Sequence, residues 1–368
     1  MGDLSVAANG KRFRPMDAAR GTAMLFVFLS HFVEVYFKRH QIPLDLAYAI
    51  AMIASPAFIS ISGAIMGILY RTRGERFHQT RWRFIRRGLF LLTLGRVLIL
   101  IAHIPLAGGW KEALRWGFMT DAIGLCILLG PIAMEALRGH QRALLGLAVY
   151  AFSWIVIMAW TPAGLVAGVV KEFLFGPFLL VSPFFTDVFP LLPWLGLYLI
   201  GTSVGELLGN FLVEGKHEKL MRTTLLAGLI ALASSIALLG FRTLQEKVLG
   251  VASIEVHLLL SPLQKLPPGP VYFLFYAGCT FLLLWALIRF QHILPVEKYS
   301  SIVEVLGRNS LFVFIIQYFV YFSLFAVVAF GPKFLWPIYF VLSAMAIWAV
   351  AYLWERGKVR WHLVRVAR

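Results

Sequence analysis

Ten stretches of about 20 mostly apolar residues follow one another along the chain, separated by short polar segments. A stretch of this length can cross a bilayer as a helix, which satisfies its own backbone hydrogen bonds there. Because 60% of the residues are hydrophobic and 14% are charged, a soluble domain could not bury this apolar surface. We therefore expect an all-α, polytopic integral membrane protein with spans at 16–37, 46–70, 84–105, 116–136, 143–161, 188–210, 221–241, 270–290, 302–329 and 334–354.

No polar segment approaches the length of a domain, so we expect a single membrane domain over 1–368. Its ends would be a cytoplasmic tail at 1–15 and a basic cytoplasmic tail at 355–368. With both termini inside, the inside loops hold more than twice as many lysines and arginines as the outside loops. This bias accounts for the net charge of +16, and it indicates membrane lipids rather than nucleic acid as the partner of the basic segments.

Two outside segments, 162–187 and 242–269, are longer than turns and rich in aromatic residues or proline. They are too apolar to extend freely into water. We expect interfacial or re-entrant pieces that cover the outer mouth of a cavity. Ordinary helices lying on the membrane surface are an equally good interpretation.

The first expected span carries four charged or titratable residues, Asp17, Arg20, His31 and Glu34. Helix geometry brings all four to one side, because Arg20 and His31 are three turns and about 16 Å apart along the axis. Asp17 and Arg20 are i,i+3 neighbours, as are His31 and Glu34. A carboxylate beside a histidine orients the ring for general base catalysis. We therefore expect Arg20 and His31 to point into one wet tunnel, although an ion pair at the helix start and an interhelical hydrogen bond would also explain these residues.

The segment MDAARGTAMLFVFLSH resembles the opening of the transmembrane acyltransferase superfamily. This superfamily includes acyltransferase family 3, the glucan succinyltransferases of the OpgC kind and the heparan-α-glucosaminide N-acetyltransferase-like proteins. Their first helix reads Asp-x-x-Arg-Gly/Ala followed by an apolar run to a histidine. Asp17, Arg20, Gly21 and His31 match that pattern.

Three later phrases extend the resemblance over most of the chain, in the expected order: SPAFISISGAIMGILY, FPLLPWLGLYLIGTSVGELLG and LGRNSLFVFIIQ. Each phrase alone is weak evidence, because small residues are common where membrane helices meet. The chain departs from the superfamily at Gln317, where many relatives have histidine. It also departs at Asp121, where relatives often have histidine or glutamine.

The resemblance implies a membrane acyltransferase that moves a short acyl group, such as acetyl, from cytoplasmic acyl-CoA to a hydroxyl or amine of an extracytoplasmic sugar or glycolipid. The catalytic residues would be Asp17, Arg20, His31 and Glu34. The residues that hold acyl-CoA would be Arg83, Arg86, Arg87, Arg308, Asn309 and Ser310. The residues at the acceptor would be Asp121, Asp187, Trp194 and Gln317.

Several of these residues have structural alternatives. The arginines between Arg71 and Arg87 can anchor the chain to anionic lipid instead of holding phosphates. Arg96 lies deep in its span and needs a partner, for which Asp121 is the candidate on the next span. Asp187 can cap a helix.

The remaining histidines and the two cysteines form no metal-binding spacing, so no metal is expected. The rival function from another class is a transporter or exporter with a charged relay inside the membrane. A membrane scaffold without chemistry is the third alternative. We expect the protein in the bacterial inner (plasma) membrane, and the sequence leaves a homo-oligomer open.

Overall fold

The computed structural model describes residues 13–37, 45–177, 184–185, 188–249, 254–327 and 332–366. Over these ranges the chain is helical and contains no strand, which confirms the expected all-α class. Nine helices in the described part are long and apolar enough to cross a membrane: Arg14–Tyr36, Ala47–Ala107, Met119–Ala136, Gly139–Ala159, Leu191–Val213, His217–Lys247, Pro270–Arg289, Ser310–Val327 and Trp336–Gly357. The second of these contains two expected spans, 46–70 and 84–105, so all ten expected spans are found.

The first half of the chain forms α1 (Arg14–Tyr36), α2 (Asp45–Ala51), α3 (Ala54–Arg73), α4 (Phe77–Phe90), α5 (Arg96–Ala107), α6 (Trp110–Leu114), α7 (Met119–Ala136), α8 (Gly139–Ala159) and α9 (Leu165–Leu174). The second half forms α10 (Leu191–Val213), α11 (His217–Leu244), α12 (Ile254–Leu259), α13 (Pro270–Arg289), α14 (Leu294–Arg308), α15 (Ser310–Tyr318), α16 (Phe325–Val327) and α17 (Trp336–Val366). A π-helical segment, Leu91–Gly95, joins α4 to α5, and another, Phe319–Leu324, joins α15 to α16.

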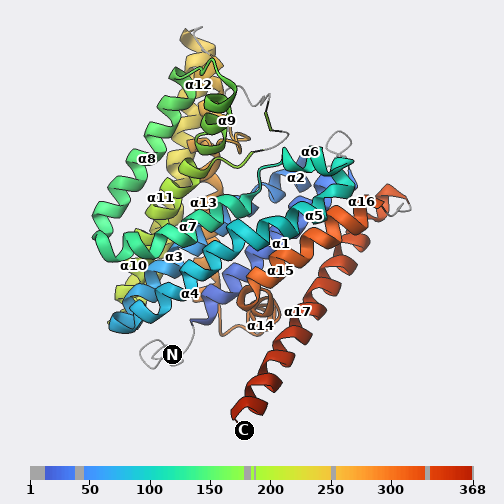
Figure 1. The fold of residues 1–368 in the computed structure, drawn as a ribbon. Helices are drawn as coiled ribbons and strands as arrows, with labels where there is room; N and C mark the ends of the chain where they lie inside the picture. The colour runs from blue at the N-terminus through green and yellow to red at the C-terminus, as the bar shows by residue number, and fades with distance from the viewer. Residues whose placement is uncertain are drawn as a thin grey trace.

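The bundle has two recognisable sides (Figure 1). The connection between α3 and α4 and the end of α17 lie on one side, which we call the inner side. The short helices α2, α6 and α12 lie toward the other side, which we call the outer side. α17 continues to Val366, into the segment expected to form the basic tail. The inner side is therefore the side that the distribution of basic residues predicts to be cytoplasmic.

Close glycine contacts join α3 to α10, the most extensive helix pair of the bundle. A Cβ atom added to Gly67 would lie 2.2 Å from the carbonyl oxygen of Thr202, and one added to Gly205 would lie 2.2 Å from that of Ala64. Small residues spaced by four let two membrane helices approach to backbone contact. The glycines of two superfamily-like phrases therefore serve packing.

Close glycine contacts also join α1 to α14. A Cβ atom on Gly21 would lie 1.9 Å from the carbonyl oxygen of Val303, and one on Gly307 would lie 2.0 Å from that of Asp17. Because both glycines are needed for this approach, the inner end of α1 meets the end of α14. The contact brings the neighbouring side chains of Arg20 and Arg308 to one level of the bundle.

The peripheral helices α8, α11 and α17 expose large apolar side chains. Leu144, Ile230 and Met345 are each more than 60% exposed. An apolar surface of this extent on a chain of spanning helices is suited to lipid contact.

Candidate active site

Two adjacent cavities lie between α1, α3, α4 and α14. The larger one, about 680 Å³, reaches to the inner side, and we call it the inner cavity. The smaller one, about 300 Å³, continues between α4, α7 and α15, and we call it the chamber. Both are lined by Arg20, Phe84, Arg87 and Arg308, so these residues form the junction between them.

Arginines dominate the polar lining of the inner cavity. Arg73, Arg76 and Arg83 line it together with the junction arginines, and among the described residues Asp17 contributes the one carboxylate of its lining. Thr80, Arg83 and Arg87 of α4 are spaced by three and four residues, which places them on one helix face. Arg86 is exposed and lines neither cavity, although the resemblance implied that it holds acyl-CoA.

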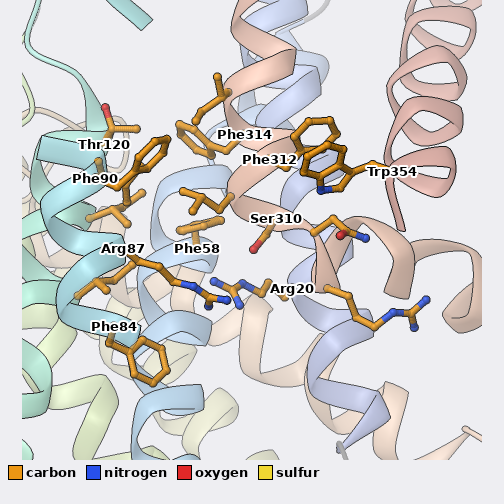
Figure 2. Close-up of a pocket in the computed structure, with 17 residues that line it drawn as sticks. Arg20, Phe58, Phe84, Arg87, Phe90, Thr120, Ser310, Phe312, Phe314 and Trp354 are labelled. Atoms are coloured by element: carbon orange, nitrogen blue, oxygen red, sulfur yellow. The ribbon is translucent and has the colours of Figure 1, made fainter. Parts of the chain in front are cut away.

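The chamber is mostly apolar beyond the junction. Its walls are formed by Phe58, Phe90, Phe314 and other apolar side chains, with Trp354 of α17 closing one side. Figure 2 shows Arg20 and Arg87 pointing toward one another from α1 and α4 at the base of this chamber. Guanidinium groups bind phosphate oxygens through parallel hydrogen bonds, so a junction lined by several of them is suited to bind phosphate.

Arg308 is neutralised by carboxylates from two helices. Its Nε and Nη2 donate to the two oxygens of Glu355 at 2.8 Å and 3.2 Å, and its Nη1 donates to Glu304 at 3.1 Å. The side chain of Asn309 also donates to Glu355, at 3.2 Å. Asn309 and Ser310 line the chamber, and Arg308 is already paired at its edge.

His31 is hydrogen-bonded to Gln317 of α15, with 2.7 Å between Nδ1 and Oε1. The amide nitrogen of Gln317 donates to the carbonyl oxygen of Phe314 at 3.2 Å, so its oxygen faces the imidazole. The Nδ1 atom of His31 therefore carries the proton, and Nε2 has the free lone pair that a base requires. This is the one hydrogen bond of His31 within the described residues. The sequence-based pairing with Glu34, one turn further along α1, is not found there.

His31 is separated from the chamber by aromatic rings. Its ring centroid lies 4.9 Å from that of Tyr318 and 4.8 Å from that of Phe322. Tyr318 in turn lies 5.5 Å from Phe314, which lines the chamber. Arg20 lines both cavities and His31 lines neither, so the two do not share one open tunnel in this structure.

Asp121 forms an ion pair with Arg96, as the structural alternative predicted. It also accepts a hydrogen bond from the backbone nitrogen of Phe118 at 3.0 Å, and it is 2% exposed. Trp194 is fully buried in α10, where its ring packs 6.3 Å from that of Phe273. These two residues support the bundle and line neither cavity. Asp187 lies outside the described residues.

The structure adds residues that the sequence reasoning missed. Arg73 and Arg76 line the inner cavity, and their spacing to Arg83 was the available signal. His103 of α5 stacks on Phe322 at 4.2 Å, so Phe322 lies between two histidines. The signal for His103 was its position seven residues after Arg96, on the same helix face. Glu355 had no sequence signal, because its partner Arg308 is on another helix.

Two of the three π-helical segments in the described residues lie at this site; the third, Gln245–Leu249, follows α11 and does not. Leu91 of the first lines the chamber, and Phe322 of the second contacts His31. Such segments are frequent at functional sites because they shift the side chains that follow them. Within the described ranges no group of three or more His, Cys, Asp or Glu residues is placed to hold a metal ion.

Comparison with protein-family models identifies the family of the chain. The family model of the heparan-α-glucosaminide N-acetyltransferase catalytic domain matches residues 12–245. This match covers α1, α3, α4 and α7, which provide most of the lining of the inner cavity and about half of that of the chamber. The search of curated proteins found no match. With well over half of its length matched, the chain belongs to the heparan-α-glucosaminide N-acetyltransferase catalytic family, and it is a multi-pass membrane acyltransferase.

Proposed function

We propose that this protein transfers a short acyl group from acyl-CoA on the inner side to a hydroxyl or amine of a sugar on the outer side, with His31 as general base. One observation carries the proposal. The junction arginines connect an arginine-lined inner cavity to an apolar chamber that lies beside the helix carrying His31.

The nucleotide of the donor would bind in the inner cavity. Arg83 and Arg87 lie on one face of α4, and Arg20 faces Arg87 from α1. A planar guanidinium can bind phosphate oxygens through two parallel hydrogen bonds, so several around one cavity suit a multiply charged nucleotide. The cavity also reaches the side predicted to be cytoplasmic, where acyl-CoA is present.

The pantetheine arm would extend from the junction through the chamber. Arg20 and His31 are eleven residues apart on α1, which corresponds to about 16 Å along the helix axis. This separation is comparable to the length of an extended pantetheine arm. Phosphates at Arg20 would therefore allow the thioester to reach the level of His31, provided that Tyr318 and Phe314 turn aside.

The chemistry at His31 follows from its tautomer. With Nδ1–H donated to Gln317, Nε2 can accept the proton of the acceptor hydroxyl or amine as its oxygen or nitrogen attacks the thioester carbonyl carbon. The carbon–sulfur bond then breaks, and the imidazolium returns the proton to the CoA thiolate. In a two-step alternative Nε2 itself attacks and carries the acyl group before the acceptor arrives. Both routes need the same orientation of the ring.

The experiment uses the purified protein with radiolabelled acetyl-CoA and an amino sugar as the acceptor. We expect His31→Ala to lose acyl transfer by about 10²- to 10⁴-fold, the range of general base catalysis. His292→Ala is the matched control, since His292 is exposed between α13 and α14. Transfer by His31→Ala at the wild-type rate would refute the role of His31. Sugar flux into liposomes without acyl-CoA would instead support a transporter.

A further inference from the structure

Thr120, the second residue of α7, has a buried hydroxyl that the fold leaves unused. The residue is 1% exposed and lines the chamber. Its hydroxyl oxygen is buried and makes no hydrogen bond to any residue of the described ranges. Buried polar atoms in native proteins are nearly always paired, so this atom indicates a ligand that the chamber receives.

The position of Thr120 explains why its hydroxyl has no partner. Buried threonines inside other helices donate to the carbonyl four residues earlier, as Thr224 does to Leu220 at 2.8 Å. α7 begins only at Met119, so Thr120 has no helical turn before it. The carbonyl four residues earlier, of Trp116, accepts a hydrogen bond from Arg96 at 3.1 Å. The usual partner is therefore engaged elsewhere.

Thr120 and the junction arginines lie at opposite ends of the chamber. Figure 2 shows Thr120 beside Phe90 and away from Arg20 and Arg87. On α7, Thr120, Ile123 and Ile127 line the chamber on one face, and the step of seven residues from Thr120 to Ile127 corresponds to about 10 Å along the helix axis. A ligand that fills the chamber would thus meet the arginines at one end, where Asn309 and Ser310 also line it, and the Thr120 hydroxyl toward the other end.

The wall around Thr120 defines the chemistry of that ligand. Phe90, Ile123 and Phe314 offer no hydrogen bond, so the ligand segment between them must be mostly apolar. A sugar carries too many hydroxyl groups for such a wall, and a plain fatty chain has nothing to offer a buried hydroxyl. A pantetheine arm has isolated amides separated by short hydrocarbon runs, and it is attached to phosphates.

We propose that Thr120 is a positioning residue for the acyl donor, whose pantetheine amide hydrogen-bonds to its hydroxyl inside the chamber. This inference rests on the proposed function, because it requires the chamber to hold the arm of acyl-CoA. The bond fixes how far the arm enters and thereby sets the position of the thioester relative to His31.

The test compares two probes by their dissociation constants for the purified full-length protein. Coenzyme A contains the arm, whereas 3′-phosphoadenosine 5′-diphosphate has the nucleotide without it. We expect Thr120→Val to weaken coenzyme A binding about five- to tenfold, as for one lost hydrogen bond, and to leave nucleotide binding unchanged. Thr120→Ser keeps the hydroxyl and should bind coenzyme A as tightly as the wild-type protein does. Thr224→Val is the control, because this buried threonine lies in α11 and lines neither cavity.

Coenzyme A binding by Thr120→Val within twofold of wild type would overturn the inference and leave the proposed function standing. Equal weakening of the binding of both probes would also overturn the inference. A lost contact to the pantetheine arm cannot weaken the binding of a nucleotide that has no such arm. If Thr120→Val does not fold, Thr120→Ala compared with Thr120→Ser measures the same loss. Failure of wild-type protein to bind either probe would refute the proposed function together with the inference.

Discussion

The hydrogen bond between His31 and Gln317 joins the first helix of the bundle to α15 across 286 positions of the sequence, with 2.7 Å between Nδ1 and Oε1. Gln317 is fully buried, and its amide orientation is set by the carbonyl oxygen of Phe314. The amide thus holds the imidazole in one tautomer, which is the role that the sequence pattern assigned to Glu34. Several expectations about activity and stability follow from this contact and from those around it.

Gln317 should orient His31 more than Glu34 does. We expect Gln317→Leu to lower kcat about tenfold, because a hydrogen bond of roughly 1 kcal/mol that fixes the base is lost. Glu34→Ala should stay within twofold of wild type, and Gln317→Glu, which keeps an acceptor for Nδ1–H, should retain most activity. Steady-state kinetics with acetyl-CoA measures all three. A larger loss in Glu34→Ala than in Gln317→Leu would reverse the assignment.

Arg87 and Arg86 are adjacent on α4 but differ in their relation to the cavities. Arg87 lines both, whereas Arg86 lines neither. We expect Arg87→Ala to raise KM for acyl-CoA by about tenfold or more, as for a lost charge-assisted hydrogen bond of about 1.5–3 kcal/mol. Arg86→Ala should change it less than threefold. Equal increases in KM for both variants would mean that acyl-CoA binding depends on the overall positive charge of the segment and not on the position of Arg87.

Gly21 should be essential for the contact between α1 and α14. Its replacement by alanine puts a Cβ atom 1.9 Å from the carbonyl oxygen of Val303, so the helices must separate. We expect a loss of about 1–3 kcal/mol in stability, measured as a lower Tm in detergent. Gly240→Ala is the control, since nothing lies within 4 Å of its added Cβ and alanine favours the helix by about 1 kcal/mol. A Tm of Gly21→Ala at or above that of wild type would contradict the close packing.

Asp121 should matter for stability rather than for catalysis. Asp121→Ala leaves the Arg96 guanidinium without its buried carboxylate, and breaking such a pair costs about 3–5 kcal/mol. The specific activity of the folded fraction should remain near wild type. Glu112→Ala, which removes an exposed pair with Arg115, should cost about 1 kcal/mol or less. Thermal unfolding and kinetics on the same samples separate the two effects, and a normal Tm with lost activity would give Asp121 a role at the acceptor.

Much of the fold could be predicted because membrane helices obey local rules. Apolar length gave the ten spans, and the need of a deep arginine for a partner gave the pair of Arg96 with Asp121. Of the three arginines expected to hold acyl-CoA at the start of the third expected span, Arg83 and Arg87 line the inner cavity and Arg86 does not. Each of these inferences depends on the residues of a single helix, or on two helices that follow each other in the sequence.

The sequence alone therefore determined the helical class, the spans and the polar residues of α1, since all of these follow from hydrophobicity and from a fixed helical period. Only the tertiary structure decided that Gln317 rather than Glu34 hydrogen-bonds to His31, that Glu355 neutralises Arg308, and that Thr120 lines a chamber. The physical reason is that these contacts depend on the rotation and depth of helices far apart in the sequence. Those are set by where glycines such as Gly21 and Gly307 let two backbones meet.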